Sequence, residues 1–515
     1  MKRPSRGLLT LWLMAGVLFA TGLGLAATDL IASGGVTELD DAAPALTVSA
    51  SAGVSAAVST AQPSQGISPI GRDLDTPLGQ RLRSLLGMFV LGLLAWSMSV
   101  NRKAIPWRIV IWGIGLQMIF AVFILKTPVG GFIFDGLNSA VMALLGFTVE
   151  GARFIFGNLV WDYVPVGGGV AGPAGQGQVL QGVGQVANTG ALFAFNVLPT
   201  IIFFSSLMTI LYHLGVMQFV VKGFAWVMQR TMHTSGAETL SAAGNIFVGQ
   251  TEAPLLIKPF IERMTMSELM AVMTGGFATV AGGVMAAYVG MLVAFFPDIA
   301  GHLMAASVMS APAALVMAKL MYPEEMVPET SSSLELAVER PDVNVIEAAA
   351  RGASEGLHLA LNVGAMLLAF VALVYMLNAI LSLMGGWVGL ESLSLELLLG
   401  WVLSPIAWLM GVPWEDATTV GGLLGLKMAL NEFFAYLQLA SVIGSDATGL
   451  SPRSVVIVTY ALSGFANFSS IAIQICGIGG IAPSRRQDLS RIGLRAMIAG
   501  TLAAFMTATV AGMLV

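Results

Sequence analysis

Long apolar runs alternate with short polar or charged segments along most of this chain. A helix needs about 20 mostly apolar residues to cross a bilayer, so these runs predict membrane-spanning helices. The predicted spans are Leu85–Val100, Val110–Leu125, Ala191–Leu214, Met266–Phe296, Met304–Leu320, Gly356–Met384, Ser454–Ile475 and Ile492–Val515. The pattern therefore favours an all-α polytopic membrane protein.

Basic residues between the spans predict which ends lie in the cytoplasm. Asn101-Arg102-Lys103 follows the first span, Lys222 and Arg230 follow the third, and Arg485 and Arg486 precede the last. Cytoplasmic loops carry an excess of Lys and Arg, so we place these segments inside the cell, together with the charged loop 323–345. This orientation is self-consistent and predicts a multi-pass protein of the inner (plasma) membrane.

The segments before and between the spans have other compositions. Residues 1–27 are basic and then apolar, with Gly24-Leu25-Ala26 as a small-residue cleavage site, so they predict a signal peptide or an uncleaved signal anchor. Residues 28–80 are rich in Ala and Ser and read as a flexible exported linker. Residues 128–165 suit an interfacial amphipathic helix, and the Gly-rich run 166–190 predicts a loop.

Two apolar segments do not fit a simple span, because Gly, Pro and carboxylates interrupt them. Residues 237–263 and 395–445 are each long enough for two short helices that meet at a polar tip. We predict that both are re-entrant hairpins. Unpaired backbone at membrane depth survives only where it is buried in protein or lines a wet cavity, so these segments are where function is expected.

The two hairpins begin what reads as an internal duplication. Thr251-Glu252-Ala253 and Asn431-Glu432-Phe433 lie at the predicted tips, and a span containing Gly276-Phe277-Ala278 or Gly464-Phe465-Ala466 follows each. An odd number of intervening spans would invert the second copy. Paired interrupted segments in two halves of a chain point to a secondary-transporter binding site near the midplane.

Composition removes most other classes of protein. The 515 residues are 56% hydrophobic and 10% charged, and soluble domains carry about a quarter charged residues. A net charge of −5 offers no basic surface for nucleic acid. A single cysteine and four separated histidines exclude an internal disulfide and a thiolate-rich metal site.

The polar residues near the tips indicate the chemistry of a ligand. Carboxylates at bilayer depth are costly and are functional by default, which selects Glu252 and Glu432. Amides such as Gln250 can face a heterocycle, and a carboxylate can accept from sugar hydroxyls. The set suits a small, neutral, polyhydroxylated ring compound, although these residue types also allow a sugar or an amino acid. Lys427 is assigned to support of the second hairpin rather than to pairing with Glu432.

At these residues the sequence resembles the concentrative nucleoside transporter family. The family signature Gly-x-Lys-x-x-x-Asn-Glu-Phe, followed by Ala and an aromatic residue, stands here as Gly425 to Phe433 with Ala435-Tyr436. The segments Gly249–Pro254 and Gly464–Ser470 also match, and the resemblance covers roughly 85–515. It implies a homotrimer in the lipid bilayer, each protomer having a scaffold and a mobile transport domain with inverted repeats, two re-entrant hairpins and discontinuous helices.

The resemblance also implies roles for single residues. The base would be read by Gln250, Thr251 and Glu252, with Val284 packing beside it. The ribose would be held by Glu432, Asn467 and Ser470, and Phe465 would flank the ligand. Sodium, the coupling ion, would bind the side chains of Asn245 and Thr279 and the backbone carbonyls of Val248 and Val280. No other cofactor is expected.

These expectations divide the chain into six parts and leave alternatives open. The parts are 1–27, the linker 28–80, scaffold helices in 81–236, the first hairpin and broken helix in 237–320, a cytoplasmic loop and scaffold helix in 321–390, and the second hairpin, broken helix and last span in 391–515. A nucleoside symporter driven by sodium is the prediction. The alternatives are proton coupling, a passive facilitator or channel, and a hydrolase using Ser354 of the G-x-S-x-G match at Gly352–Gly356 or Glu252.

Overall fold

The fold is known from a computed structural model, which describes residues 76–160, 163–166, 169–170, 178–179, 185–188, 193–330, 342–386, 390, 393–444 and 449–515. Within these residues, eight helical segments are long and apolar enough to cross a membrane, and a ninth is possible if one bent helix pair counts as a span. The predicted all-helical membrane architecture is confirmed. The predicted signal segment 1–27 and most of the linker 28–80 lie outside the described residues.

The first part of the described chain is built from long helices on the outside of the molecule. The helices are α3 (Leu78–Ser97), α4 (Trp107–Lys126), α5 (Pro128–Phe156), α6 (Leu198–His213) and α7 (Val216–Met232). Two short turns lie between α5 and α6, the 3-10 turn η1 (Gly157–Val160) and the π-helical turn η2 (Phe193–Val197). Because α5 is itself long and apolar enough to span a membrane, its interfacial position remains a prediction.

The Gly-rich run after α5 contains short strands as well as loop. In its described residues, β1 (Tyr163–Val166) pairs antiparallel with β4 (Gln185–Asn188), and β2 (Gly169–Val170) pairs with β3 (Gln178–Val179). The prediction of loop over 166–190 was therefore wrong for the described strand residues in that range, and the helix predicted over 128–165 does not continue into Tyr163–Pro165, which belong to β1. Strands this short contain few β-branched or aromatic residues, so the high Gly content of the segment indicated a loop instead.

The predicted first hairpin leads into helices that form the interior of the protein. The hairpin consists of α8 (Gly236–Gly244) and the 3-10 helix η3 (Ala253–Arg263), and α9 (Met266–Ala278), α10 (Gly282–Leu292) and α11 (Ile299–Met321) follow. The predicted span Met266–Phe296 is thus broken, since Thr279 leaves α9 in an extended conformation. Almost every residue of α9 and α11 is buried.

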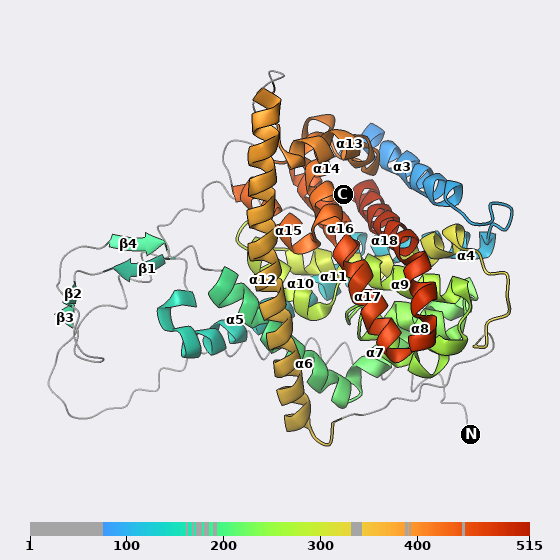
Figure 1. The fold of residues 1–515 in the computed structure, drawn as a ribbon, viewed down its shortest axis with the longest axis horizontal. Coiled ribbons are helices and arrows are strands. Elements are labelled where there is room, and N and C mark those ends of the chain that lie inside the picture. Colours follow the sequence, from blue (N-terminus) through green and yellow to red (C-terminus); the bar gives the residue numbers. More distant parts are fainter. Residues whose placement is uncertain are drawn as a thin grey trace.

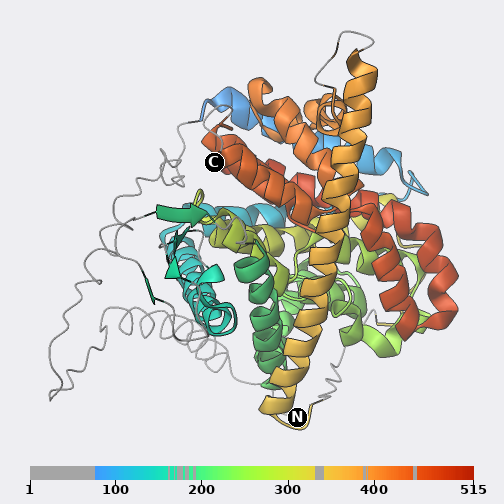
Figure 2. The same ribbon diagram turned by 60° about the vertical axis from the view of Figure 1, so that its left-hand side comes forward.

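A second set of helices repeats this order. After α12 (Val345–Gly386) and α13 (Leu395–Met410) come α14 (Trp414–Ala429), α15 (Glu432–Gly444), α16 (Pro452–Leu462), α17 (Phe468–Ile481), the turn η4 (Pro483–Arg485) and α18 (Arg486–Leu514). Figures 1 and 2 show α12 crossing the whole height of the molecule. Segment 395–445 holds three helices rather than the expected two, because a 117° bend between α13 and α14 precedes the hairpin of α14 and α15.

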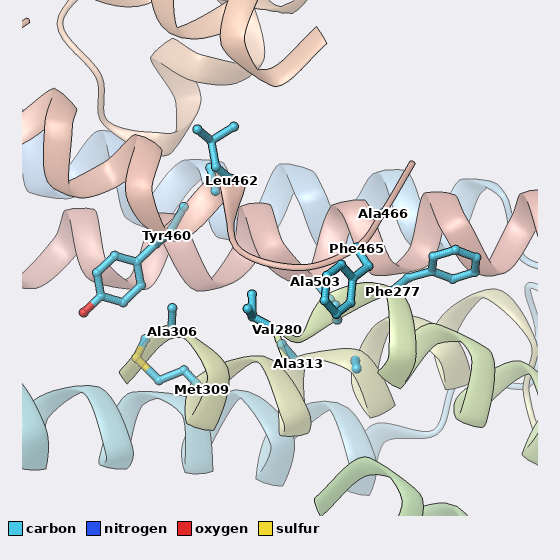
Figure 3. Packing of buried hydrophobic residues seen from close by; sticks show 14 of the residues in the cluster. Phe277, Val280, Ala306, Met309, Ala313, Tyr460, Leu462, Phe465, Ala466 and Ala503 are labelled. Carbon is cyan, nitrogen blue, oxygen red and sulfur yellow. The ribbon is translucent and has the colours of Figure 1, made fainter. Parts of the chain in front are cut away.

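The two Gly-Phe-Ala tripeptides meet in the centre of the fold. Gly464 has φ +99°, and a Cβ there would lie 2.7 Å from the carbonyl oxygen of Ala278 and 2.8 Å from that of Phe277. Figure 3 shows Phe277 and Phe465 in the same packed region. Only glycine allows both this left-handed conformation and this close approach, so Gly464 lets the breaks of the two repeats touch.

A buried ion cluster fastens the start of the first hairpin to its neighbours. Ser235 and Thr265 form capping boxes with Glu238 and Glu268, at the N-termini of α8 and α9. The Lys319 ammonium of α11 lies 2.7 Å from Glu238 Oε2, and the Ser235 hydroxyl donates to Glu268 Oε1 at 2.6 Å. Three helices are therefore joined by side chains that water does not reach.

The G-x-S-x-G match lies inside an uninterrupted helix and serves packing. Both glycines of α12 face α6: a Cβ at Gly352 would lie 2.7 Å from Ser206 Cα, and one at Gly356 would lie 2.8 Å from Ile202 Cα. Small residues four apart let membrane helices approach closely. A nucleophile elbow needs a strand before it, which this continuous helix does not provide.

Gly356→Ala should therefore destabilise the protein, although alanine favours a helix over glycine by about 1 kcal/mol. The new methyl group would meet backbone atoms of α6, which cannot move aside as a flexible side chain can. Gly364→Ala is the matched control, because the nearest atom there is the terminal Leu198 Cδ1 at 3.3 Å. Thermal unfolding of the purified variants measures both effects, and equal melting temperatures for the two variants would contradict the packing role.

Candidate functional site

A cavity of about 390 Å³ lies between the turn of the first hairpin, the start of α10, and the helices α6 and α12. Its size falls in the range of small-molecule sites, about 300–1,000 Å³. Three of the predicted site residues, Glu252, Val284 and Val248, line it, and the Glu252 side chain is exposed toward it. Lys258 and Arg351 also line it.

Three of the lining residues form an ion-paired triad. The Arg351 guanidinium contacts both oxygens of Asp342, at 2.7 and 2.8 Å, and its third nitrogen contacts Glu355 at 2.9 Å. The hydrogen bonds from Arg351 hold the pKa of the Asp342 carboxyl below its usual range. Because two carboxylates occupy the guanidinium, it is poorly placed to hold a phosphate.

Glu432 begins α15 at the tip of the second hairpin, and its side chain is only 5% exposed. Its Oε1 accepts from the Tyr288 hydroxyl at 2.9 Å, and its Oε2 accepts from Asn467 Nδ2 at 2.9 Å. A buried carboxylate is tolerated only when it is hydrogen-bonded, and both oxygens have a donor here. Glu432 therefore has a fixed orientation beside the break between α16 and α17.

A chain of hydrogen bonds connects Glu432 with the first hairpin. Asn467 caps α17 by accepting from the Ser470 backbone amide at 2.9 Å. Gln250 Nε2 donates to Ser470 Oγ at 3.2 Å, and Gln474 Nε2 donates to Gln250 Oε1 at 3.0 Å. The structure thus brings four of the predicted residues, Gln250, Ser470, Asn467 and Glu432, into one buried network that crosses between the two repeats.

The remaining predicted substrate residues flank this network. Phe465 is 8% exposed and lies in the break between α16 and α17. Thr251 is half-buried against α17, where a Cβ on Gly477 would lie 3.2 Å from its methyl carbon. Glu252 is the one predicted carboxylate that lies on the cavity wall rather than in the network.

Two members of the network were not among the predicted residues. Tyr288 lies one helical turn after Val284, and Gln474 lies one turn after Ser470. The spacing of four residues on the same helix could have indicated both, since such residues share a face. Beyond this spacing, neither residue belongs to a motif.

The predicted sodium residues supply oxygen atoms that can still accept. Asn245 is 1% exposed, and within the described residues neither polar atom of its amide has a hydrogen-bond partner. No backbone amide described by the structure donates to the carbonyl of Val248 or Val280, and the Thr279 hydroxyl donates to Gly275 while its oxygen can still accept. A hard cation prefers such oxygens, so this set fits sodium.

Lys427 holds the second hairpin to the end of α16. Its ammonium donates to the carbonyl oxygens of Ala461 at 2.9 Å and Ser463 at 3.1 Å. A cation at a helix C-terminus satisfies carbonyls that have no partner within the helix. Among the ion pairs of the described residues, none joins Lys427 to Glu432, in agreement with the supporting role predicted for this lysine.

Three family models match successive parts of the chain. Residues 86–159 match the N-terminus of the Na+ dependent nucleoside transporters, residues 194–295 match a nucleoside recognition (gate) domain, and residues 302–512 match the C-terminus of the same transporters. The hairpin turn with Gln250 to Glu252 lies in the second match, and Glu432 and Asn467 lie in the third.

Curated relatives match over 84% of this chain. They include an uncharacterized transporter of Haemophilus influenzae, 45% identical over 98% of its length, and the nucleoside permease NupC of Helicobacter pylori, 43% identical over 98% of its length. The sodium/nucleoside cotransporter 1 of Rattus norvegicus is 42% identical, and the match spans 64% of that longer protein.

Solved structures agree with the fold. An inward-facing, substrate-bound structure of CNTnw is 40% identical with a TM-score of 0.74, over 84% of this chain and 97% of that one. An outward-facing variant of CNTnw is 42% identical with a TM-score of 0.75, over 85% and 98%.

Proposed function

Because the chain belongs to the concentrative nucleoside transporter family, we propose that it imports nucleosides across the plasma membrane by sodium symport. The observation that carries the proposal is the buried network from Gln250 through Ser470 and Asn467 to Glu432. It provides amides for a base and an oriented carboxylate for ribose hydroxyls. The family consists of transporters, so a hydrolase that uses Ser354 or Glu252 is set aside.

The substrate site would lie where the network meets the cavity. Gln250, Thr251 and Glu252 would read the base with Val284 beside it, and Glu432, Asn467 and Ser470 would hold the ribose next to Phe465. Glu252 faces the cavity and so is available to a ligand that enters there. Because the Arg351 donors on the cavity wall are occupied by carboxylates, a neutral nucleoside is favoured over a phosphorylated one.

Sodium would bind between the first hairpin and the break that follows α9. Asn245 and Thr279 would give side-chain oxygens, and Val248 and Val280 would give carbonyls. One sodium ion crossing about 100 mV releases about 2.3 kcal/mol, and a tenfold gradient adds about 1.4 kcal/mol. The roughly 3.7 kcal/mol total would concentrate a neutral nucleoside several hundred-fold. The homotrimer implied by the family is part of this proposal.

Uptake of radiolabelled uridine and adenosine into proteoliposomes tests the proposal. We expect uphill uptake that requires an inward sodium gradient. Uphill uptake driven by a proton gradient without sodium would show that the coupling ion is the proton. Uptake that never exceeds equilibrium would identify a passive facilitator. The mass of the purified protein in nanodiscs tests the trimer.

Thr279→Ala should raise the sodium concentration for half-maximal uptake about tenfold, which corresponds to about 1.4 kcal/mol. The substitution removes one oxygen of the proposed sodium site and one helix-end hydrogen bond. Thr501→Ala is the matched control, because the Thr501 hydroxyl is also buried and donates to the carbonyl four residues earlier, at 3.0 Å. An unchanged sodium dependence in Thr279→Ala would count against this ion site.

A further inference from the structure

Tyr288 is a fully buried phenol whose ring is held on two sides. It stacks on Tyr436 with ring centroids 4.4 Å apart and an angle of 27°, and it meets Phe433 edge-on at 4.9 Å. Its hydroxyl donates to Glu432 Oε1 at 2.9 Å. Because the ring cannot swing away without breaking both aromatic contacts, the hydroxyl stays aimed at the carboxylate.

Glu432 is fixed by two donors that come from different parts of the fold. Tyr288 approaches one oxygen from α10, and Asn467 approaches the other from the break before α17. A carboxylate has about four lone-pair positions, so these two side-chain donors leave room for it to accept from a ligand. With a donor on each oxygen, the carboxylate plane cannot rotate, and the direction of the remaining lone pairs is set.

The helix that carries Tyr288 also forms part of the cavity wall. Val284, one turn earlier on α10, lines the cavity, and the Gly282 backbone amide donates to the Phe247 carbonyl of the first hairpin at 3.0 Å. The position of α10 is therefore fixed relative to the cavity. The hydrogen bond from Tyr288 in turn fixes Glu432 relative to α10.

We propose that Tyr288 is a positioning residue that orients Glu432 and thereby sets how strongly the transporter requires a ribose hydroxyl. The proposal rests on the proposed function, in which Glu432 accepts from the ribose. Tyr288 itself is fully buried and would act through Glu432 rather than by touching the substrate. Its hydrogen bond to a charged group keeps the acceptor directed at the hydroxyl, and an undirected carboxylate would distinguish a ribonucleoside from its deoxy analogue less well.

The experiment measures uptake of uridine, 2′-deoxyuridine and 3′-deoxyuridine by membrane vesicles that contain the wild type or Tyr288→Phe. The readout is the ratio of kcat/KM for uridine to that for the more impaired deoxy analogue. We expect Tyr288→Phe to reduce this ratio about tenfold, as the loss of one well-placed hydrogen bond predicts. The amount of folded protein cancels from the ratio, because all substrates are measured on the same vesicles.

Tyr436→Phe is the matched control. Tyr436 lies in the same aromatic stack and is equally buried, but its hydroxyl donates to the Thr459 carbonyl at 2.7 Å. It should keep the wild-type ratio. A Tyr288→Phe variant that loses uptake of all three nucleosides in parallel, with its ratio unchanged, would overturn the proposal, and so would failure of that variant alone to reach the membrane.

The wild type distinguishes this proposal from the one on which it rests. If the wild-type protein does not discriminate against either deoxy analogue, the assignment of Glu432 to the ribose fails. If it does discriminate and Tyr288→Phe discriminates equally well, the ribose assignment stands and the role of Tyr288 fails.

Discussion

Glu432→Gln is expected to abolish measurable nucleoside uptake, a loss on the order of 10²–10³-fold. Both donors that face Glu432, the Tyr288 hydroxyl and Asn467 Nδ2, need an acceptor. A glutamine amide has one accepting oxygen and an NH2 group that only donates, so with its oxygen on Asn467 Nδ2 it would turn its NH2 toward Tyr288, whose hydroxyl would have to accept instead of donate. The proposed bond to the ribose hydroxyl would also lose its charge, and charge-assisted hydrogen bonds are about twice as strong as neutral ones.

Glu415→Gln is the control for this result. Glu415 lies in the first turn of α14 on the same hairpin and is exposed, so the same chemical change there should leave uptake near the wild-type level. Uptake into proteoliposomes reconstituted with equal amounts of folded protein separates loss of transport from loss of stability. Wild-type transport by Glu432→Gln would contradict the proposal that Glu432 holds the ribose.

Lys319→Met should give the largest loss of stability, about 3–5 kcal/mol in the free energy of unfolding. Lys319 is 1% exposed, lies 2.7 Å from Glu238 and 3.1 Å from Glu324, and donates to Ser267 at 2.9 Å. Methionine fills a similar volume but leaves these carboxylates without their cation. Thermal unfolding of the purified protein would report the loss as a lower Tm.

Two further variants make the stability result specific. Lys222→Met removes an exposed lysine of α7 and should leave the melting temperature unchanged. Adding Glu238→Gln to Lys319→Met should restore part of the lost stability, because it removes one of the uncompensated charges. If the double variant is less stable than Lys319→Met, the ion pair is not the source of the effect.

Much of the architecture could be predicted from the sequence because each element has a local signal. Apolar length predicted the spans, and interruptions by Gly and carboxylates predicted the hairpin tips, where the structure places the turn before Ala253 and the start of α15 at Glu432. The extra bend that separates α13 from α14 was not predicted. Gly411 adopts φ +110° there, but an isolated Gly before a Pro does not distinguish a turn within a hairpin from a turn ahead of one.

The candidate site was predictable only in part. Gln250, Asn467 and Ser470 were selected as polar residues near the tips and given roles by the resemblance, and the structure places them in one network, whereas Tyr288 and Gln474 carry no motif and were missed. Glu252 and Glu432 look equivalent as carboxylates at two tips. The structure gives them different surroundings, with Glu252 facing the cavity and Glu432 held by two donors.

The sequence by itself determined that this chain is a helical membrane protein with two interrupted, repeated segments, because hydrophobic length and helix-breaking residues act over a few turns of one chain. Only the tertiary structure decided which buried polar groups share hydrogen bonds. Those bonds join residues such as Gln250 and Ser470, which are 220 positions apart, and local spacing carries no information about such pairs. Their partners are fixed when the two repeats pack together, at the point where Gly464 allows the breaks to touch.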